Sequence, residues 1–283
     1  MAVLEHLLNL KGLLLIVLVF VPFEQLLPLH AEQKIFRRGW LNDVVYVFLN
    51  GILVRFGLFL VVVLSILAFD WPILQGFRLA VASQPHWLQA IELIALADLC
   101  FYGVHRLFHA VPLLWRFHTI HHSIEEMDWL AAHRIHALDQ ILTKGASLIP
   151  AFTFGFSEWA IGAYFVLYQW HTLLIHANVR LSFGPLRWLV ASPEFHHWHH
   201  SNQPEAYQKN FAAQLSLWDI VFGTAHMPKG ETPSAYGVNE PVPAGYVSQF
   251  FYPFRRNGAA ASQQSEDSQM NASRQTELAP GSR

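Results

Sequence analysis

The sequence predicts an all-α protein: a multi-pass integral membrane helical bundle with a histidine-rich metal site on its cytoplasmic side. Three observations lead to this prediction. Only 13% of the 283 residues are charged and 53% are hydrophobic, whereas a soluble domain carries roughly 25% charged residues. Long apolar runs, each near the length that crosses a bilayer, alternate with polar segments. Finally, 13 of the 17 histidines fall between His105 and His200, about one third of the chain.

Composition excludes several other classes of protein. The formal charge of -2 offers no basic face for nucleic acid. The single cysteine, Cys100, excludes an intramolecular disulfide framework and a thiolate metal cage, and its apolar surroundings indicate a packing role. The chain contains neither a GxGxxG segment nor a P-loop, so no nucleotide-binding motif is present.

Residues 1–87 are predicted to form N-terminal transmembrane helices. The run from Gly12 to Leu29 is about long enough to span a bilayer and is interrupted only by Glu24 and Gln25. A signal peptide is the alternative, but Lys11 is the only basic residue before the run and no clear small-residue cleavage site follows. The run from Val44 to Phe69 exceeds the usual spanning length, so this helix should tilt.

Residues 88–256 are predicted to form the catalytic domain. An apolar run from Leu88 to Tyr102 contains Asp98 and leads directly into the first histidine pair; ionisable groups at such depth usually face a site. The run from Ile141 to Ile175 has helix breakers near its centre, which favour a helical hairpin. Residues 257–283 are rich in Ser, Gln, Ala and Asn and are predicted to be disordered.

Basic residues predict the orientation in the membrane. Lys34, Arg37 and Arg38 lie between the first two apolar runs, so this loop should be cytoplasmic. Counting crossings then returns the chain to the cytoplasm at His105, and a hairpin over 141–175 keeps all histidine clusters on that face. A bacterial inner membrane and the endoplasmic reticulum both fit this topology.

Three histidine clusters indicate a metal site. The first is HxxxH, the second is HxxHH, and the third repeats HxxHH 78 residues later with one extra histidine inside it. Histidines at i and i+4 share a helical face and can grip one ion, whereas adjacent histidines point about 100° apart and suit two neighbouring ions. The cluster histidines are His105 and His109, then His118, His121 and His122, then His196, His199 and His200, with His197 as the extra one.

Two ions need one or two further ligands, for which His136 and His176 are the best candidates. Whether His133, His171 or His197 binds metal stays open, and four histidines stand apart from the clusters: His6, His30, His86 and His226. The clusters contain no cysteine and few carboxylates, which excludes a structural zinc module and a glutamate-rich diiron bundle. Imidazole suits zinc, copper, iron and nickel, so ligand type leaves the metal open.

At these residues the sequence resembles the fatty acid hydroxylase and sterol desaturase superfamily of membrane histidine-cluster diiron oxidases. The similarity covers roughly residues 98–224 and includes Asp98, Tyr102, the three clusters, Arg134-Ile-His136, His176-Ala-Asn178, Asn210-Phe211 and Leu217-Trp-Asp219. Two departures are visible. The family commonly has proline and a carboxylate after the Arg-x-His element, where this chain has Ala137, Leu138 and Asp139, and it often has asparagine at the position of Asp128.

The resemblance implies two non-haem irons held by eight to ten histidines, with O2 as co-substrate, and oxidation of a lipid C–H bond by hydroxylation or desaturation. Asp98 and Asp219 would orient ligand imidazoles as neighbouring acceptors; a helix-boundary cap or a salt bridge is the alternative for both. Asn178 would hold a metal-bound water, with a helix cap as the alternative. No cytochrome b5-type HPGG segment or flavin motif is present. Electrons should therefore come from a separate donor of the ferredoxin or cytochrome b5 type.

Two other classes fit less well. A zinc-dependent membrane hydrolase would use a metal-activated water, but the chain has no HExxH motif and no obvious glutamate base. A haem or metal-transport protein would place isolated histidines on facing helices, which the paired HxxHH clusters do not resemble. The substrate, the choice between hydroxylation and desaturation, and the oligomeric state cannot be read from the sequence.

Overall fold

The computed structural model describes residues 10–255 and is all-helical over this range, as the sequence predicts. Its described residues contain no strand and only two isolated β-bridges, Pro28 with Val179 and Ser201 with Tyr236. The α-helices are α2 (Leu10–Leu26), α3 (Trp40–Ala68), α4 (Gln75–Ala82), α5 (His86–Ala110), α6 (Pro112–His122), α7 (Ala137–Thr153), α8 (Glu158–His176), α9 (Pro193–His199), α10 (Leu217–Val221) and α11 (Tyr246–Phe251). Short 3-10 helices are η1 (Pro72–Leu74), η2 (Ala131–His133), η3 (Gly184–Trp188), η4 (Pro204–Ala206) and η5 (Tyr252–Phe254).

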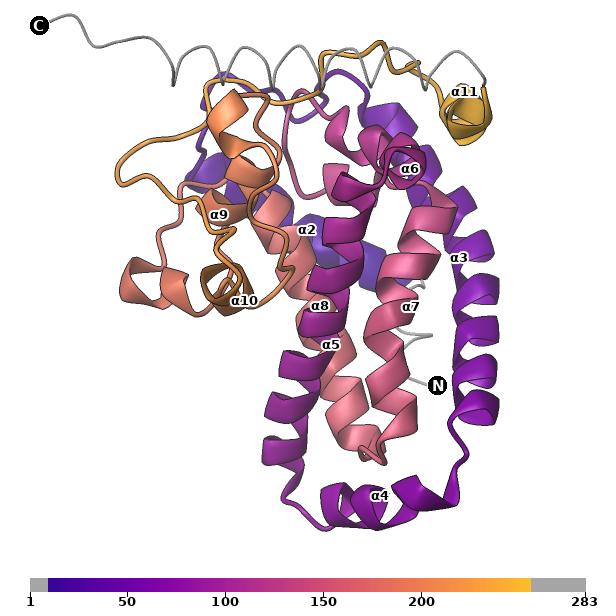
Figure 1. The fold of residues 1–283 in the computed structure, drawn as a ribbon. Helices are drawn as coiled ribbons and strands as arrows, with labels where there is room; N and C mark the ends of the chain where they lie inside the picture. Colours follow the sequence, from indigo (N-terminus) through magenta and orange to yellow (C-terminus); the bar gives the residue numbers. More distant parts are fainter. Residues whose placement is uncertain (1–9, 256–283) are drawn as a thin grey trace, which may run out of the picture.

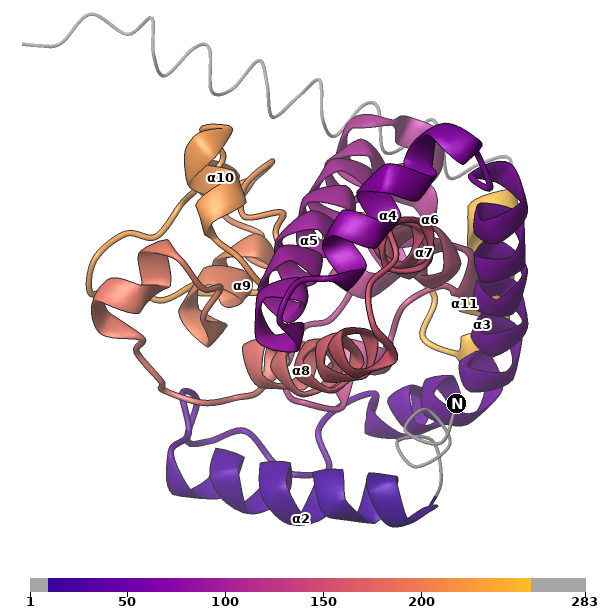
Figure 2. The same ribbon diagram turned by 90° about the horizontal axis from the view of Figure 1, so that it is seen from below.

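Four long helices, α3, α5, α7 and α8, run side by side and form the body of the molecule (Figures 1 and 2). The helix α4 links α3 to α5 at one end of this bundle, and α6 and α11 lie at the opposite end (Figure 1). Two of the helices, α3 and α5, are long and apolar enough to cross a membrane. They correspond to the second and third predicted spans, and α5 continues through the first histidine pair.

The predicted hairpin over 141–175 is confirmed as α7 and α8. Gly155 turns the chain between them with φ 82°, and a Cβ at this position would lie 2.9 Å from the carbonyl oxygen of Arg78. Ser157 then caps α8 by accepting a hydrogen bond from the backbone N–H of Ala160 at 3.3 Å. On the outer side of α7, Gly145 lies so close to Val61 of α3 that a Cβ would come within 3.2 Å of it. Small residues therefore let these helices pack closely.

The first apolar run differs from its prediction as a transmembrane span. It forms α2, whose described part has 17 residues and contains Pro22; among the described residues, α2 is not one of the candidate membrane spans. In both ribbon views α2 lies across the bundle rather than along it (Figures 1 and 2).

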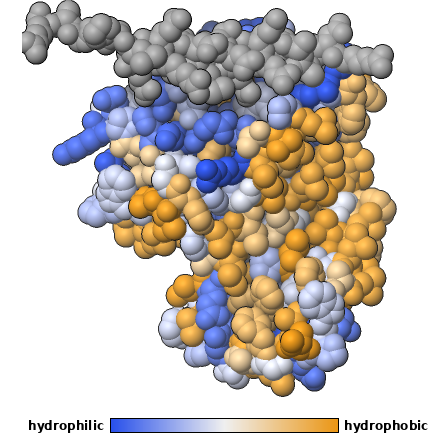
Figure 3. All heavy atoms as spheres, in the orientation of Figure 1, coloured by the Kyte–Doolittle hydropathy of each residue, from blue (hydrophilic) through white to orange (hydrophobic). Residues whose placement is uncertain are grey.

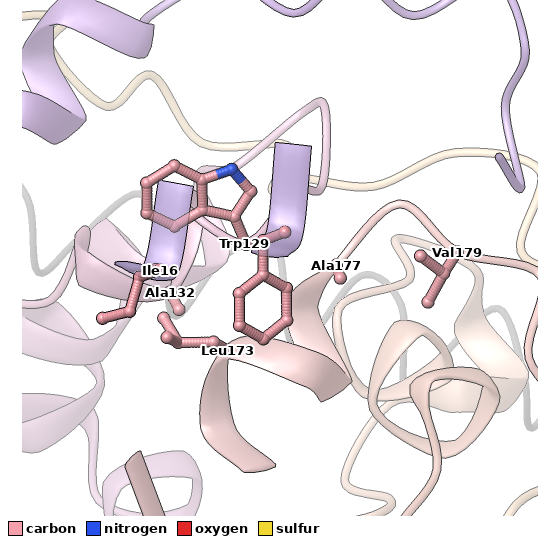
Figure 4. Packing of buried hydrophobic residues seen from close by; sticks show 7 residues of the cluster. Ile16, Trp129, Ala132, Leu173, Ala177 and Val179 are labelled. Carbon is pink, nitrogen blue, oxygen red and sulfur yellow. The ribbon is translucent and has the colours of Figure 1, made fainter. Parts of the chain in front are cut away.

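Packing and one buried carboxylate fix α2 in this crosswise position. Ile16 and Phe20 pack into a core with Trp129 and Leu173 (Figure 4). The Glu24 carboxylate accepts hydrogen bonds from the backbone N–H groups of Trp129 at 2.8 Å and Asn178 at 2.9 Å. The charged residue that interrupts the apolar run thus joins α2 to two loops near the histidines. The predicted tail, 257–283, and His6 lie outside the described residues.

Candidate metal centre

Four helices bring the histidine clusters together at one end of the bundle. The last turns of α5 carry His105 and His109, α6 ends with the HxxHH cluster, α9 carries most of the third cluster, and His176 is the last residue of α8. Pro112 starts α6 directly after α5, and the two helices pack against each other. Residues 13 positions apart in sequence, such as His105 and His118, therefore face one another.

The imidazoles form two buried groups, each with its ligand nitrogens within 4.8 Å of one another. Group A is His105, His109, His118, His122 and His199, and group B is His121, His176, His196 and His200. Adjacent His121 and His122 belong to different groups, as their 100° separation on a helix requires. His118 and His122, at i and i+4 on α6, share group A. The structure thus brings together nine of the ten histidines expected as ligands.

Most of these rings use Nδ1 to donate a hydrogen bond away from the centre of the group. The acceptors are Phe211 O for His105 (2.6 Å), Lys209 O for His199 (2.8 Å), Arg134 O for His121 (3.1 Å), Thr172 O for His176 (2.8 Å) and Asp139 Oδ2 for His118 (2.7 Å). Because a carbonyl oxygen can only accept, the proton of each neutral ring bonded to one stays on Nδ1. The Nε2 atom of those rings is then unprotonated, and its lone pair is directed inward.

The inward Nε2 atoms of three pairs of rings lie at hydrogen-bond distance from one another. The separations are 2.9 Å for His105 and His118, 3.0 Å for His122 and His199, and 3.2 Å for His121 and His176. In the pair of His121 and His176, both Nδ1 atoms face carbonyl oxygens, so two neutral rings point lone pairs at each other. A cation between them would turn this repulsion into coordination. The donor set therefore fits metal ions bound through imidazole.

Burial keeps these rings neutral and ready to bind metal. Desolvation first, and then the neighbouring imidazoles, lower the pKa of His122 and His200 well below the usual value of a histidine. Metal binding requires the neutral ring, so lowering the pKa favours the ligand form at neutral pH.

Asp139 is a site residue to which sequence reasoning assigned no role. Its carboxylate lies 2.7 Å from His118 Nδ1 and is buried, the arrangement that orients a metal-bound histidine and raises its basicity. The sequence does contain a signal for this role, because Asp139 is a carboxylate that follows three residues after His136 of the Arg-x-His element. In the sequence it stands out only as a departure from the family's pattern.

The three residues predicted to lie beside the metal ligands contact other groups instead. Asp98 accepts hydrogen bonds from the backbone N–H groups of residues 213–215, and Asp219 accepts those of residues 211 and 212. Together they fix the segment whose Phe211 carbonyl holds His105, so they act on the site through the backbone. The Asn178 side chain bonds the backbone N–H and carbonyl of His30, so both polar groups of its amide have protein partners.

His136, expected as a ligand, lies outside both groups. Its Nδ1 accepts from the backbone N–H of Leu138 at 3.1 Å and so caps α7, and its Nε2 lies 3.1 Å from the carbonyl oxygen of Phe250. Both ring nitrogens are occupied, and the ring stacks on Phe250. The Arg-x-His spacing does not reveal this capping role, because the apolar run begins only at Ile141 whereas α7 begins at Ala137.

The histidines left open also lie outside the groups. His197 is bonded to the Tyr236 hydroxyl at 2.8 Å and to the Ala177 carbonyl at 3.1 Å, and His171 lies 2.8 Å from the Ala191 carbonyl. His133 belongs to neither group. The histidines expected to stand apart do so within the described range, namely His30, His86 and His226.

A buried charge quartet, Arg37, Asp43, Asp128 and Arg134, supports group B and was not foreseen. Arg37 binds both oxygens of Asp128 at 2.6 and 2.7 Å and also contacts Asp43 at 2.6 Å, and Arg134 binds Asp43 at 2.5 and 2.9 Å. The carbonyl of Arg134 is the acceptor for His121. Since Asp128 has an arginine partner, a carboxylate suits this position where the family often has asparagine.

Trp115 and Glu240 cover one side of group A. The Trp115 ring lies 5.1 Å from the ring of His109 and 5.3 Å from that of His122, centroid to centroid. Its Nε1 donates to Glu240 at 3.0 Å, and the Thr119 hydroxyl donates to the same carboxylate at 2.5 Å. The loop that carries Glu240 is thereby fastened onto α6 beside the metal ligands.

Comparison with known sequences agrees with this geometry. The fatty acid hydroxylase family matches residues 90–224, which contain all nine histidines of the two groups. The chain is 30% identical over 181 residues to ornithine lipid hydroxylase OlsE of Rhizobium tropici, covering 62% of this chain and 53% of that protein. It is 33% identical over 147 residues to human alkylglycerol monooxygenase, covering 51% of this chain and 32% of that protein.

A third relative is fatty acid hydroxylase vlmA of a Lecanicillium species, 29% identical over 146 residues, which cover 46% of this chain and 39% of the relative. The chain thus spans about half of the length of the bacterial relative and about a third of the others. No solved structure matches the chain.

Proposed function

The chain belongs to the fatty acid hydroxylase superfamily, and on this premise we propose that it is a membrane-bound non-haem diiron oxidoreductase that uses O2 and external electrons to oxidise a lipid C–H bond. The reaction is hydroxylation or desaturation of a fatty acyl, sterol or related lipid. The three relatives described above are a lipid hydroxylase, an alkylglycerol monooxygenase and a fatty acid hydroxylase, which supports a lipid as the substrate class.

The observation that carries the proposal is the pair of buried imidazole groups with inward lone pairs. One ion in group A and one in group B account for the division of His118, His121 and His122 between two groups. Two iron ions held in this way would supply, with O2 and electrons, the oxidising chemistry that an unactivated C–H bond requires. Nine neutral imidazoles add no charge of their own.

The chain's own residues orient the ligands and exclude water. Backbone carbonyls and Asp139 fix the ring planes, and they keep the imidazole protons on Nδ1 and directed away from the reacting lipid. Trp115 and Phe211 pack against group A and shield it from solvent. The exposed apolar faces of α3 and α5 support a lipid that enters from the bilayer beside the bundle.

Electrons are proposed to arrive from a separate ferredoxin or cytochrome b5-type protein on the cytoplasmic side. The sequence offers no HPGG segment or flavin motif to hold an electron carrier of its own. The proposed location is an integral membrane position, in a bacterial inner membrane or the endoplasmic reticulum, with both histidine groups facing the cytoplasm.

Metal analysis of matched variants tests the proposal. The purified protein should contain close to two irons per chain. His199→Ala, which removes a group A nitrogen, should lose iron and activity, whereas His197→Ala, two residues away and bonded to Tyr236 and Ala177, should retain iron. One zinc per chain, or a haem absorption band, would contradict the diiron proposal. Comparing oxygen and double-bond content of lipids from cells with and without the protein would then identify the reaction.

A further inference from the structure

The short helix α11 and the following η5 expose large apolar side chains and bury one polar side chain. The inward side chain of Gln249 is 2% exposed and accepts hydrogen bonds from Asn42 Nδ2 at 2.9 Å and the Tyr46 hydroxyl at 3.0 Å. The outward side chains are apolar: Val247 is 67% exposed, Phe251 55% and Phe254 62%. Their spacing of four and three residues places them on one face. An apolar outer face of this kind is expected of a helix whose outer solvent is lipid.

The apolar face of α11 is continuous with that of α3. Val45 and Leu49 of α3 line one groove together with Tyr246, Val247 and Phe251. Figure 3 shows the hydrophobic surface running from the end that carries α11 down the side formed by α3, while the other side of that end is hydrophilic. An apolar patch that extends along a helix able to cross a membrane indicates contact with the bilayer rather than with a small ligand.

The orientation of α11 and the basic residues beside it indicate how deeply this apolar face lies in the bilayer. Figure 1 shows α11 end-on beside the upper end of α3, so its axis lies across the bundle. Exposed Arg255 follows directly after Phe254, and Arg116 donates a hydrogen bond to the Arg255 carbonyl. Cationic side chains next to an apolar face are typical of helices that lie in the boundary between head groups and acyl chains.

We propose that α11 and η5 form an in-plane membrane anchor, with Val247, Phe251 and Phe254 inserted about 5–10 Å into the bilayer boundary and Arg255 among the phospholipid head groups. The inference depends on α3 being embedded in the membrane and not on the reaction catalysed. Hydrogen bonds also connect the anchor to residues near the metal centre. Tyr246 bonds Asn50, which bonds the Ile135 carbonyl, and the Phe250 carbonyl faces His136.

Depth-dependent fluorescence quenching tests the anchor. The full-length protein with Cys100→Ala is given one new cysteine, Val247→Cys or Phe254→Cys, labelled with bimane and placed in phospholipid nanodiscs. A doxyl group near the head end of the acyl chain is expected to quench both labels more than a doxyl group near the chain end, and iodide in the water is expected to quench them little. Two labelled controls mark the extremes: Phe56→Cys on α3, which is 64% exposed, and exposed Glu231→Cys.

The controls separate the possible failures. If Phe56→Cys is quenched by the deep doxyl group while Val247→Cys and Phe254→Cys behave like Glu231→Cys, the anchor is overturned although α3 is embedded. If neither the doxyl groups nor iodide quench the two labels, protein covers this face. The covering protein would be a second copy or another part of the chain, and the anchor is again overturned. If Phe56→Cys itself is quenched only by iodide, the membrane placement fails and the anchor with it.

Discussion

The Nδ1 atom of His118 shows how one neighbouring residue can affect metal binding at the site. His118 is the only described group member whose Nδ1 lies against a carboxylate, since the other assigned partners are backbone carbonyls. Residues in this position commonly change metal affinity or activity 10–100-fold when they are mutated. Among the described residues, a carboxyl group therefore orients a ligand ring in group A, whereas backbone carbonyls do so in group B.

Asp139→Ala should weaken iron binding at group A by about 10–100-fold, because His118 loses the acceptor that holds its ring plane. Competition between the protein and a chromogenic chelator measures this change. Asp70→Ala is the control, since the Asp70 side chain is 80% exposed and pairs only with Arg78 among the described residues. Equal iron affinity in the two variants would show that Asp139 does not orient a ligand.

Two histidines on α8 provide a second residue-level test. His176 belongs to group B, whereas His171, one and a half turns earlier, bonds the Ala191 carbonyl. His176→Ala should lower the iron content from about two per chain towards one, since group B would keep only three nitrogens, and His171→Ala should leave it unchanged. Iron analysis by mass spectrometry decides; loss of iron in His171→Ala alone would mean that the two roles are reversed.

At the scale of elements, the charge quartet connects pieces of chain that are far apart in sequence. Asp43 lies in the first turn of α3, Arg37 in the loop before it, and Asp128 and Arg134 in the segment between α6 and α7. Gly39, with φ 82°, lies so close to Arg134 that a Cβ would come 2.6 Å from its Nη2. The quartet thus sets the position of the segment whose carbonyl bonds His121.

Asp43→Asn should lower the free energy of unfolding by about 3–5 kcal/mol, because it leaves buried arginines without their shared partner. Removing a complete pair with Arg37→Met and Asp128→Leu should cost less, since no buried charge is left unpaired. The exposed pair of Arg38 and Glu125 supplies the control, and Arg38→Gln should cost less than about 1 kcal/mol. Chemical unfolding in detergent measures all three; a loss in Asp43→Asn no greater than that in Arg38→Gln would rule out a structural role for the quartet.

The α2 helix shows where prediction by element fails. Hydropathy and length favoured a transmembrane span over Gly12 to Leu29, yet the direction of a helix depends on its tertiary partners. The Glu24 carboxylate, which only interrupts the run in sequence, bonds the backbone of residues 129 and 178. Contacts across more than 100 residues leave no periodic signal, so sequence alone could not orient α2.

For the molecule as a whole, features that depend on nearby residues were more predictable from sequence than contacts between distant residues. The helical class, α3, α5, the hairpin of α7 and α8, and the clustering of histidines all follow from patterns within about 30 residues. The division into two groups also followed, because the helical angle between His121 and His122 is a local property. The partners of Asp98, Asp219, Asn178 and His136 did not follow, since those partners lie on loops or short helices whose positions are set by tertiary packing.

The burial of so many imidazoles makes a prediction about the stability of the metal-free protein. Desolvation first, and then the neighbouring imidazoles, lower the pKa of six histidines outside α3 and α5 well below the usual value, namely His118, His121, His122, His196, His199 and His200. In the unfolded chain these rings titrate near pH 6.5. Above that pH the rings are neutral in both states and contribute no pH dependence.

Below pH 6.5 the unfolded chain binds protons that the folded chain excludes, so the free energy of unfolding falls as the pH falls. The chelator-treated protein should therefore lose stability steeply between about pH 7 and 5, by up to about 1.4 kcal/mol per pH unit for each excluded proton. Unfolding curves across this range measure the slope. His200→Gln should reduce the slope by about one proton. A stability that stays constant from pH 7 to 5 would mean that the imidazoles are not held neutral in the folded, metal-free protein.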